Sequence, residues 1–344
     1  MSADPPQTVA IAGSHPTRHA PRASLAELYA PIAEDLAEAE RIFDEELAGD
    51  LPFVGELCDT VRSYRGKRLR PALLLLSAKA VGGVTSQHWT LAAVVEMVHV
   101  ATLVHDDVLD EADQRRRLPT IRALSGNVAA VLLGDYLISH AFHLCSSLDS
   151  QYASRRIGAT TNVVCEGELL QNQYGARDRI SEGDYFDVVR RKTAMLTATA
   201  CELGARFAGA SAEIVEAMRG YGLSAGIAFQ IIDDVLDVAG DEAELGKTLG
   251  QDFRLGKATL PVIHCLENGP AEVVAALRGG LSALDSPSRQ QLRQWLEESG
   301  SLDYAVTTAA EFVAAAGSRL ESIPPSPARD SLAALAEFII RRRF

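Results

Sequence analysis

The pentapeptide Asp-Asp-Val-Leu-Asp occurs twice in the chain, at residues 106–110 and 233–237. Each copy follows a strongly apolar stretch, residues 98–104 and 227–232, so each is expected near the end of a helix whose body lies in the core. The first and fifth residues of such a motif share one helix face, so each copy is expected to project two carboxylates in one direction. A fold for this chain must therefore be arranged around two acidic helix segments.

The repeated carboxylates predict a metal site. Like charges at this spacing repel and weaken an isolated helix, so a counter-charge is expected. Mg²⁺ suits the motif because it takes hard oxygen ligands and binds one or two carboxylates together with substrate phosphates. The alternative is a solvated acidic helix face, the commoner meaning of one acidic cluster. The repetition of Val and Leu inside both copies favours the metal hypothesis.

The composition and periodicity predict an all-α fold. Hydrophobic residues make up 47% of the chain and aromatic residues only 6%, a mixture that suits helix packing. Apolar residues recur every three or four positions from residue 32 onward, and no segment shows sustained strand alternation. Residues 1–24 contain four prolines and no such period, which predicts a disordered tail. Residues 25–344 are expected to form a single helical domain.

The charge distribution indicates small polyanions as ligands. The formal net charge of -13 argues against a nucleic-acid partner. Basic residues nevertheless cluster at 65–70, 115–117 and 190–192, as expected for phosphates held at defined points. Neither a Gly-x-Gly-x-x-Gly motif, a Gly-x-x-x-x-Gly-Lys-Thr motif nor a Cys/His metal set is present, so Gly-rich nucleotide binding is not expected.

The cysteines and the hydropathy predict a cytoplasmic protein without a transmembrane segment. The five cysteines have no close Cys-x-x-Cys pair and are expected to be reduced. The N-terminal residues lack an apolar signal core, and no run reaches the roughly 18 uncharged apolar residues that a spanning helix needs. A substrate with a diphosphate at one end and a hydrocarbon at the other would use the acidic motifs, the basic clusters and the long apolar helices together.

These motifs resemble those of the trans-polyprenyl diphosphate synthases, in the order in which that family carries them and over roughly residues 25–344. The matching segments are Gly66-Lys-Arg-Leu-Arg-Pro71, His99, residues 106–110, Arg115-Arg116, Gly134-Asp135, Lys192-Thr193, Phe229-Gln230, residues 233–237, Gly246-Lys247 and Gly256-Lys257.

The resemblance implies the isoprenoid-synthase fold, a bundle of long helices around a deep cavity, as a homodimer that condenses isopentenyl diphosphate with an allylic diphosphate. It implies about three Mg²⁺ ions and, with release of a long product, a peripheral membrane contact. The implied isopentenyl diphosphate ligands are Lys67, Arg70, His99 and Arg116. The implied metal ligands are Asp106, Asp110 and Asp233, which with Lys192 form the catalytic set. The implied allylic diphosphate contacts are Arg115, Lys192, Lys247 and Lys257, with Thr193 and Gln230 beside the carbocation.

Several alternatives stay open on the sequence alone. His99 on an apolar face is compatible with a core histidine. A class I terpene cyclase also ionises allylic diphosphates but needs no second diphosphate site, and a non-catalytic subunit should have lost part of an aspartate motif. The chain departs from the family at Arg65 and Arg117, where glycine is usual. Both positions lie near the implied diphosphates.

The helix before the first aspartate motif predicts the product length. Thr102 and Ala101 lie about one turn from Asp106 and Val98 two turns, which at 1.5 Å per residue puts Val98 roughly 12 Å away. In the family an aromatic residue at the place of Ala101 gives short products, so Ala101 predicts a product longer than C20, in the range C35–C50. Alternatively, Ala101 is small only to let two helices pack closely. A geranylgeranyl or shorter-chain diphosphate synthase is the alternative function.

Overall fold

The computed structural model describes residues 24–49, 51–64, 66–175, 180–241, 249–281 and 287–341. Helices dominate these ranges, and the strands within them are two residues long, which confirms the all-α prediction. The elements in chain order are α1 (Leu25–Tyr29), η1 (Ala30–Ile32), α2 (Ala33–Glu46), α3 (Pro52–Ser63), α4 (Leu69–Val81), α5 (Ser86–Leu109), β1 (Gln114–Arg115), β2 (Leu118–Pro119), α6 (Ile121–Ser146), α7 (Gln151–Gly175), α8 (Glu182–Val189), η2 (Arg190–Ala194), α9 (Met195–Phe207), α10 (Ala212–Ala239), α12 (Gln251–Arg254), α13 (Leu260–Asn268), α14 (Ala271–Leu281), α15 (Arg289–Glu298), α16 (Ser301–Arg319), η3 (Leu320–Ser322) and α17 (Pro327–Ile340). The tail prediction concerns residues 1–24, of which 1–23 lie outside the described residues.

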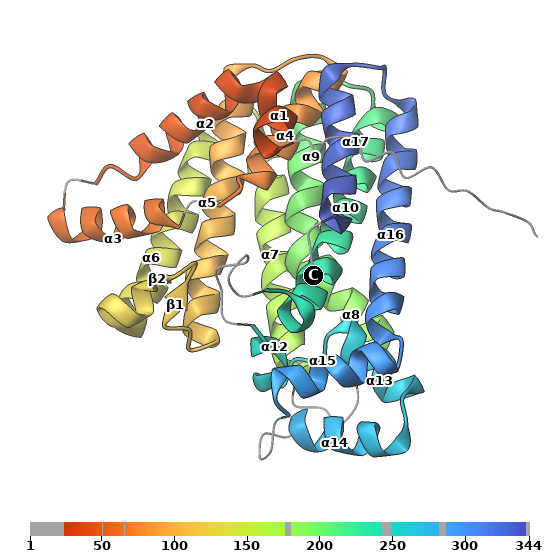
Figure 1. Ribbon diagram of the computed structural model, residues 1–344. Coiled ribbons are helices and arrows are strands. Elements are labelled where there is room, and N and C mark those ends of the chain that lie inside the picture. The colour runs from red at the N-terminus through yellow and green to blue at the C-terminus, as the bar shows by residue number, and fades with distance from the viewer. Residues whose placement is uncertain are drawn as a thin grey trace, which may run out of the picture.

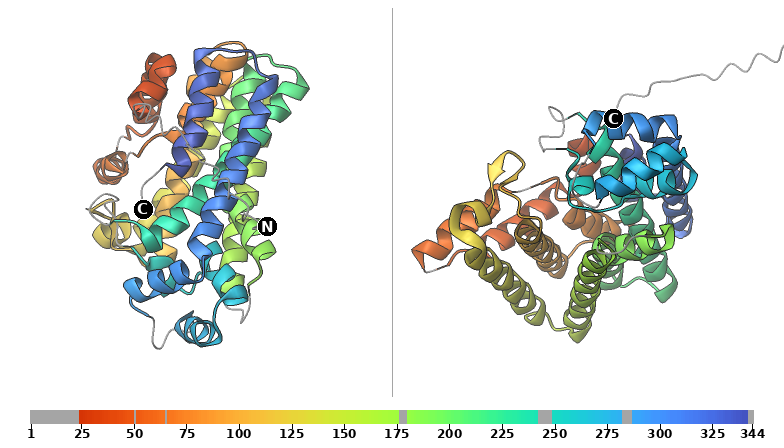
Figure 2. Two further views of the ribbon diagram at one scale, coloured as in Figure 1. Left: turned by 45° about the vertical axis from the view of Figure 1, so that its right-hand side comes forward. Right: turned by 90° about the horizontal axis from the view of Figure 1, so that it is seen from below.

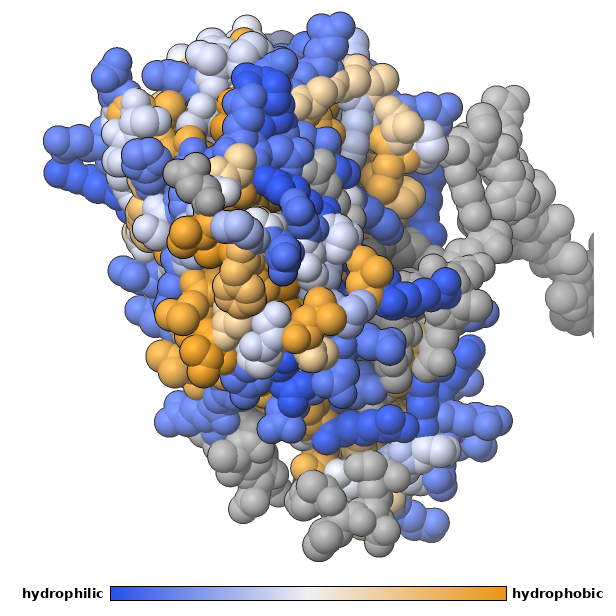
Figure 3. Space-filling model, turned by 90° about the vertical axis from the view of Figure 1, so that its left-hand side faces the viewer, coloured by the Kyte–Doolittle hydropathy of each residue, from blue (hydrophilic) through white to orange (hydrophobic). Residues whose placement is uncertain are grey.

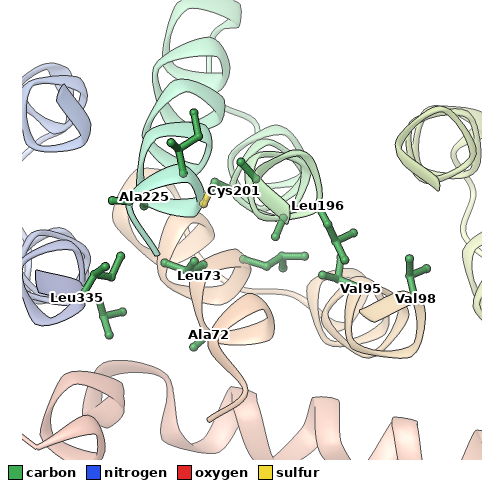
Figure 4. Packing of buried hydrophobic residues seen from close by; sticks show 14 of the residues in the cluster. Ala72, Leu73, Val95, Val98, Leu196, Cys201, Ala225 and Leu335 are labelled. Atoms are coloured by element: carbon green, nitrogen blue, oxygen red, sulfur yellow. The ribbon is translucent and has the colours of Figure 1, made fainter. Parts of the chain in front are cut away.

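Long helices form the centre of the molecule, as Figures 1 and 2 show. Helix α9 packs between α4 and α10, and α5 packs along α6. The centre of α4 is buried on all sides, because its consecutive residues Leu73 to Leu76 are each at most 2% exposed. A helix that is apolar all round is stable only inside such a bundle. Figure 4 shows the side chains from α4, α5, α9, α10 and α17 that meet in this core.

Caps and turns set the boundaries of α4 and α5. Thr85 caps α5, in a reciprocal pair with His88. Helix α5 ends at Leu109, and a short connection leads to the β1–β2 hairpin. Pro71 is the third residue of α4, a position in the first turn where its missing N–H costs no helical hydrogen bond.

Both aspartate motifs lie toward the lower end of the bundle in Figure 1. The first occupies the last turn of α5, and Asp110 is the residue that follows the helix. The second occupies the last two turns of α10, which ends at Ala239. The π-helical turn η2 packs against α7 and α10 and carries Lys192 and Thr193. Such turns occur frequently at functional sites.

Candidate active site

The first and last carboxylates of the first motif, Asp106 and Asp110, each face a lysine. Lys257 Nζ lies 2.7 Å from Asp110 Oδ1, and Lys192 Nζ lies 3.9 Å from Asp106 Oδ2. Burial raises the pKa of Asp106 to about 6, while Lys192 opposes the shift and Glu168 adds to it. The structure therefore brings together Asp106, Asp110, Lys192 and Lys257.

Helix α7 supplies two residues that the sequence analysis did not assign. Lys192 Nζ donates to Gln171 Oε1 at 2.9 Å and forms an ion pair with Glu168. Burial disfavours the charge on Lys192, but Asp106 and Glu168 raise its pKa overall. Glu168 and Gln171 are three residues apart on one helix face, and this polar pair was the available sequence signal. They hold the ammonium group beside the first motif.

The turn η2 connects the two aspartate helices. Lys192 points to Asp106 on α5, whereas its neighbour Thr193 donates from Oγ1 to Gln230 Oε1 on α10 at 2.8 Å. Asp233 lies one turn beyond Gln230 and is partly buried. A cationic group and a hydroxyl group are thus fixed side by side between the two motifs.

The aspartates of the second motif differ in burial, since Asp233 is half-buried whereas Asp234 and Asp237 are buried. Asp237 is 4% exposed, and its Oδ2 accepts the backbone N–H of Asp252 at the start of α12 at 3.3 Å. Asp234 is also 4% exposed and accepts hydrogen bonds from Tyr185 and Gln230. Burial and the charge of Asp252 raise the pKa of Asp234 well above its usual value. Asp237 therefore anchors the start of α12. The resemblance assigned Asp233 of this motif to metal.

The hairpin after α5 positions the arginines. Arg115 forms a two-bond ion pair with Asp107, with Nε and Nη2 at 3.1 and 2.9 Å from Oδ1, so its charge first compensates a buried carboxylate. Arg116 donates to the carbonyl oxygen of Tyr64 and packs over Gly66. Arg116 and Arg117 have φ values of 51° and 65° in the two-residue turn between β1 and β2. Such hairpin turns need this left-handed conformation, which explains why glycine suits position 117.

Arg70, one of the predicted isopentenyl diphosphate residues, lies near the start of α4. Within the described residues, Arg70 Nε is buried and has no hydrogen-bond partner. Burial lowers the pKa of Arg70, and Glu96 opposes that effect. Burial, then Arg70, Arg115 and Arg116, lower the pKa of His99 well below its usual value. Lys67 Nζ lies 5.7 Å from the centre of the Phe338 ring on α17. Arg65 and Lys247 lie outside the described residues.

The predicted chain-length residues line α5 above the first motif. Ala101 and Val98 are at most 1% exposed, and the half-buried Thr102 donates its hydroxyl group to the carbonyl oxygen of His99. One pocket of about 360 Å³ includes Arg70, Thr193 and Phe229 in its lining. A second, of about 420 Å³, lies between α2, α4 and α5 and includes Ala92 and Glu96.

The residues present fit magnesium that arrives with a diphosphate. In the described ranges no group of three or more His, Cys, Asp or Glu side chains is close enough to hold a metal ion. Mg²⁺ characteristically takes only one or two protein carboxylates and completes its shell with water and phosphate oxygens. Asp106 and Asp110 provide such carboxylates, and each is balanced by a lysine whose charge a diphosphate would also attract.

We expect Gly167→Ala on α7 to lower kcat by about 10- to 100-fold, because it displaces Lys192. A Cβ atom at Gly167 would lie 2.6 Å from the backbone nitrogen of Lys192 and 2.9 Å from Arg191 Cβ. Gly158→Ala on the same helix is the matched control, since its Cβ would meet only Phe142 at 3.6 Å. Steady-state kinetics of both variants check this, and equal rates for the two would contradict it.

We expect His99 to make the protein less stable as the pH falls below about 6.5. The unfolded chain takes up a proton at His99 near that pH, whereas the folded state, with its lowered pKa, does not. Between pH 6.5 and 5.5 this lowers the free energy of unfolding by about 1 kcal/mol. Urea denaturation of the wild type and His99→Gln should show a smaller loss for the variant. Identical losses would count against a neutral imidazole at His99 in the folded protein.

The chain is similar in sequence and structure to characterised synthases. The model of the family described as Polyprenyl synthetase matches residues 52–298. Octaprenyl diphosphate synthase of Escherichia coli is 36% identical over 314 residues, covering 90% of this chain and 96% of that protein. A polyprenyl synthase from Caulobacter crescentus, solved with calcium and isoprenyl diphosphate, superposes with a TM-score of 0.90 at 33% identity, over 94% of this chain and 99% of that chain. A decaprenyl diphosphate synthase from Rhodobacter capsulatus gives 0.87 at 34% identity, over 93% and 99%. The chain therefore belongs to the polyprenyl synthetase family, the trans-polyprenyl diphosphate synthases.

Proposed function

We propose that this protein repeatedly condenses isopentenyl diphosphate with an allylic diphosphate, head to tail, to give a trans-polyprenyl diphosphate of C35–C50. The observation that carries the proposal is the turn η2, where Lys192 faces Asp106 and Thr193 faces Gln230. This turn places the ammonium group of Lys192, for the departing diphosphate, next to the hydroxyl oxygen of Thr193, for the allylic carbon. The long product is supported by the similarity to octaprenyl and decaprenyl diphosphate synthases and by the small side chain of Ala101.

The reaction depends on stabilisation of charge more than on a nucleophilic side chain. Breaking the allylic carbon–oxygen bond places negative charge on the diphosphate and leaves a carbocation, which the isopentenyl double bond attacks. We assign Lys192 and Lys257 to the departing diphosphate, and Thr193 and Gln230 to the cation. About three Mg²⁺ ions, held by Asp106, Asp110 and Asp233, would supply further positive charge when bound.

We assign the second diphosphate site to Lys67, Arg70, His99 and Arg116. The buried Nε of Arg70 supports this assignment, since a buried donor without a hydrogen-bond partner is costly unless an anion completes it. The lowered pKa of His99 keeps the ring neutral, so it can donate one hydrogen bond to a phosphate oxygen without bringing a further charge.

Product sizing tests the proposal. The purified protein is incubated with Mg²⁺, labelled isopentenyl diphosphate and primers of C10, C15 and C20, and the products are sized. The expected result is a ladder that ends between C35 and C50. Products of C20 or less would indicate a short-chain synthase, and release of a hydrocarbon without isopentenyl incorporation would indicate a cyclase. Turnover only after addition of a second protein would indicate a non-catalytic subunit.

We propose that α6 pairs with a second copy of the chain in a homodimer. Its outer face is apolar, with Val128 74% and Leu132 62% exposed, and it forms part of the orange surface in Figure 3. Helix α6 is also the one helix in the described residues long and apolar enough to cross a membrane, at 26 residues, contrary to the sequence expectation. Asp135 near its midpoint, 64% exposed, would cost roughly 2.5–3.5 kcal/mol in a bilayer, which favours the dimer.

We expect Val128→Glu to shift the protein from dimer to monomer, because a charge then lies in the apolar face of α6. Size-exclusion chromatography with light scattering measures the mass. Gln290→Glu, at an exposed position of α15, adds the same charge elsewhere and should leave the dimer intact. A monomeric wild type, or an unchanged mass for Val128→Glu, would contradict the assignment.

We further propose a cytoplasmic location with a peripheral membrane contact for product release. The five cysteines are free thiols, as expected in a reducing compartment. Leu51 and Phe53, at the start of α3, are 66% and 59% exposed and offer an apolar contact with a membrane surface. Cell fractionation tests the location, and co-sedimentation with lipid vesicles of the wild type and Phe53→Ser tests the contact.

A further inference from the structure

Three hydrogen bonds between side chains connect α8, α10 and η2 behind the carbocation site. Tyr185 on α8 donates its hydroxyl group to Asp234 Oδ2 at 2.7 Å. Gln230 Nε2 donates to Asp234 Oδ1 at 2.7 Å. Thr193 Oγ1 donates to Gln230 Oε1 at 2.8 Å. Tyr185 and Asp234 are 6% and 4% exposed, so the bond between them is shielded from water.

The direction of the chain of bonds follows from which atoms donate. Both oxygens of Asp234 accept, Oδ2 from the hydroxyl group of Tyr185 and Oδ1 from the amide nitrogen of Gln230. With its nitrogen turned to Asp234, Gln230 presents its oxygen to Thr193. Thr193 must then donate. Its single hydrogen is used, so the lone pairs of its oxygen remain for a cation.

We propose that Tyr185 is a positioning residue for catalysis, which sets the orientation of the Thr193 hydroxyl group through Asp234 and Gln230. This inference rests on the proposed function, because it concerns the oxygen that faces the allylic cation. Tyr185 itself contacts neither metal nor substrate in this arrangement. Without the hydrogen bond from Tyr185, Asp234 Oδ2 is left unpaired in a buried site. This favours rotation of the Asp234 side chain away from Gln230.

A close approach of backbones holds the other end of the chain of bonds in place. A Cβ atom at Gly226 on α10 would lie 2.7 Å from Ala194 Cα, so α10 and η2 lie closer together than a larger residue permits. Because the backbones on both sides of Thr193 and Gln230 are confined, their remaining freedom is side-chain rotation. Tyr185 and Asp234 restrict that rotation.

The test is the kinetics of Tyr185→Phe, which keeps the ring and removes only the donor. We expect kcat to fall by about 10- to 100-fold while KM for both substrates changes by less than about threefold. Tyr304→Phe is the matched control, because Tyr304 donates to the carboxylate of Glu182 on the same helix α8, at 2.9 and 3.0 Å, outside this chain of bonds. Its kcat should equal that of the wild type.

A double-mutant cycle separates positioning from a general structural effect. In a Thr193→Val background the hydroxyl group is gone, so Tyr185→Phe should cost little more; in a Thr193→Ser background the full loss should return. Equal losses in all three backgrounds, an unchanged kcat for folded Tyr185→Phe, or the same loss in Tyr304→Phe would overturn the inference. Failure of the wild type to condense the substrates would instead refute the proposed function.

A second variant covers the case in which Tyr185→Phe does not fold. Asp234→Asn places an amide nitrogen toward Gln230 when its oxygen accepts from Tyr185. Gln230 must then rotate its amide by half a turn and donate to Thr193, whose hydrogen turns toward the cation. We expect kcat to fall with no change in the Mg²⁺ concentration that gives half-maximal activity. A wild-type kcat would contradict the inference, as would a loss of kcat that excess Mg²⁺ restores.

Discussion

Replacing Asp106 or Asp233 by alanine is expected to abolish condensation, with kcat at least roughly 1,000-fold lower at saturating Mg²⁺. Each carboxylate is assigned to a metal ion that stabilises the departing diphosphate, so its loss acts on the transition state. The loss should appear with every allylic primer. Single-turnover incorporation of labelled isopentenyl diphosphate measures it.

The stability of Asp106→Ala distinguishes a functional carboxylate from a structural one. Burial, with Glu168 and Asp110, raises the pKa of Asp106 in the folded protein, so the charged carboxylate does not favour the fold. We expect the melting temperature of the variant to equal or exceed that of the wild type. Asp113→Ala is the control, because Asp113 is 77% exposed and pairs with Arg122 outside the site. Near-normal turnover of Asp106→Ala at low Mg²⁺ would refute the metal assignment.

Ala101→Phe is expected to shorten the product from C35–C50 to about C20 or less while the first condensations continue. A phenyl ring one turn from Asp106 would close the path of the growing chain, whereas the diphosphate sites are untouched. Sizing the labelled products by reversed-phase chromatography measures the change. An unchanged product ladder from a folded, active variant would instead indicate that Ala101 is small only for helix packing.

Ser86→Phe provides a control on the same helix. Ser86 is the first residue of α5 and is exposed, so the added ring would lie in solvent. The position lies about five turns before Asp106 along the helix, away from the first aspartate motif. This variant should keep the wild-type product length. Shortening by both variants would indicate a general disturbance of α5 and not a block in the chain's path.

Local sequence patterns predicted the parts of the site that depend on one helix at a time. The aspartate motifs, the basic start of α4 and the Lys192-Thr193 pair were recognisable because spacing along a helix determines which side chains share a face. The contacts of Lys192 with Glu168 and Gln171 were not, since they join residues 24 and 21 positions apart on different helices. The pairing of Arg115 with Asp107 also depends on the hairpin that follows α5.

By itself, the sequence determined the helical class and the order of the main helices. It also indicated the family, through the two aspartate motifs and the basic residues for two diphosphates. Apolar periodicity and motif spacing are local patterns, so they can be recognised without knowledge of the packing. Only the tertiary structure decided that Asp234 and Asp237 turn into the core, that Asp110 meets Lys257 across 147 positions, and that Tyr185 lies behind Gln230. Those contacts arise where buried helices approach closely. A buried polar group needs a hydrogen-bond partner, and the packing of the helices decides which residue provides it.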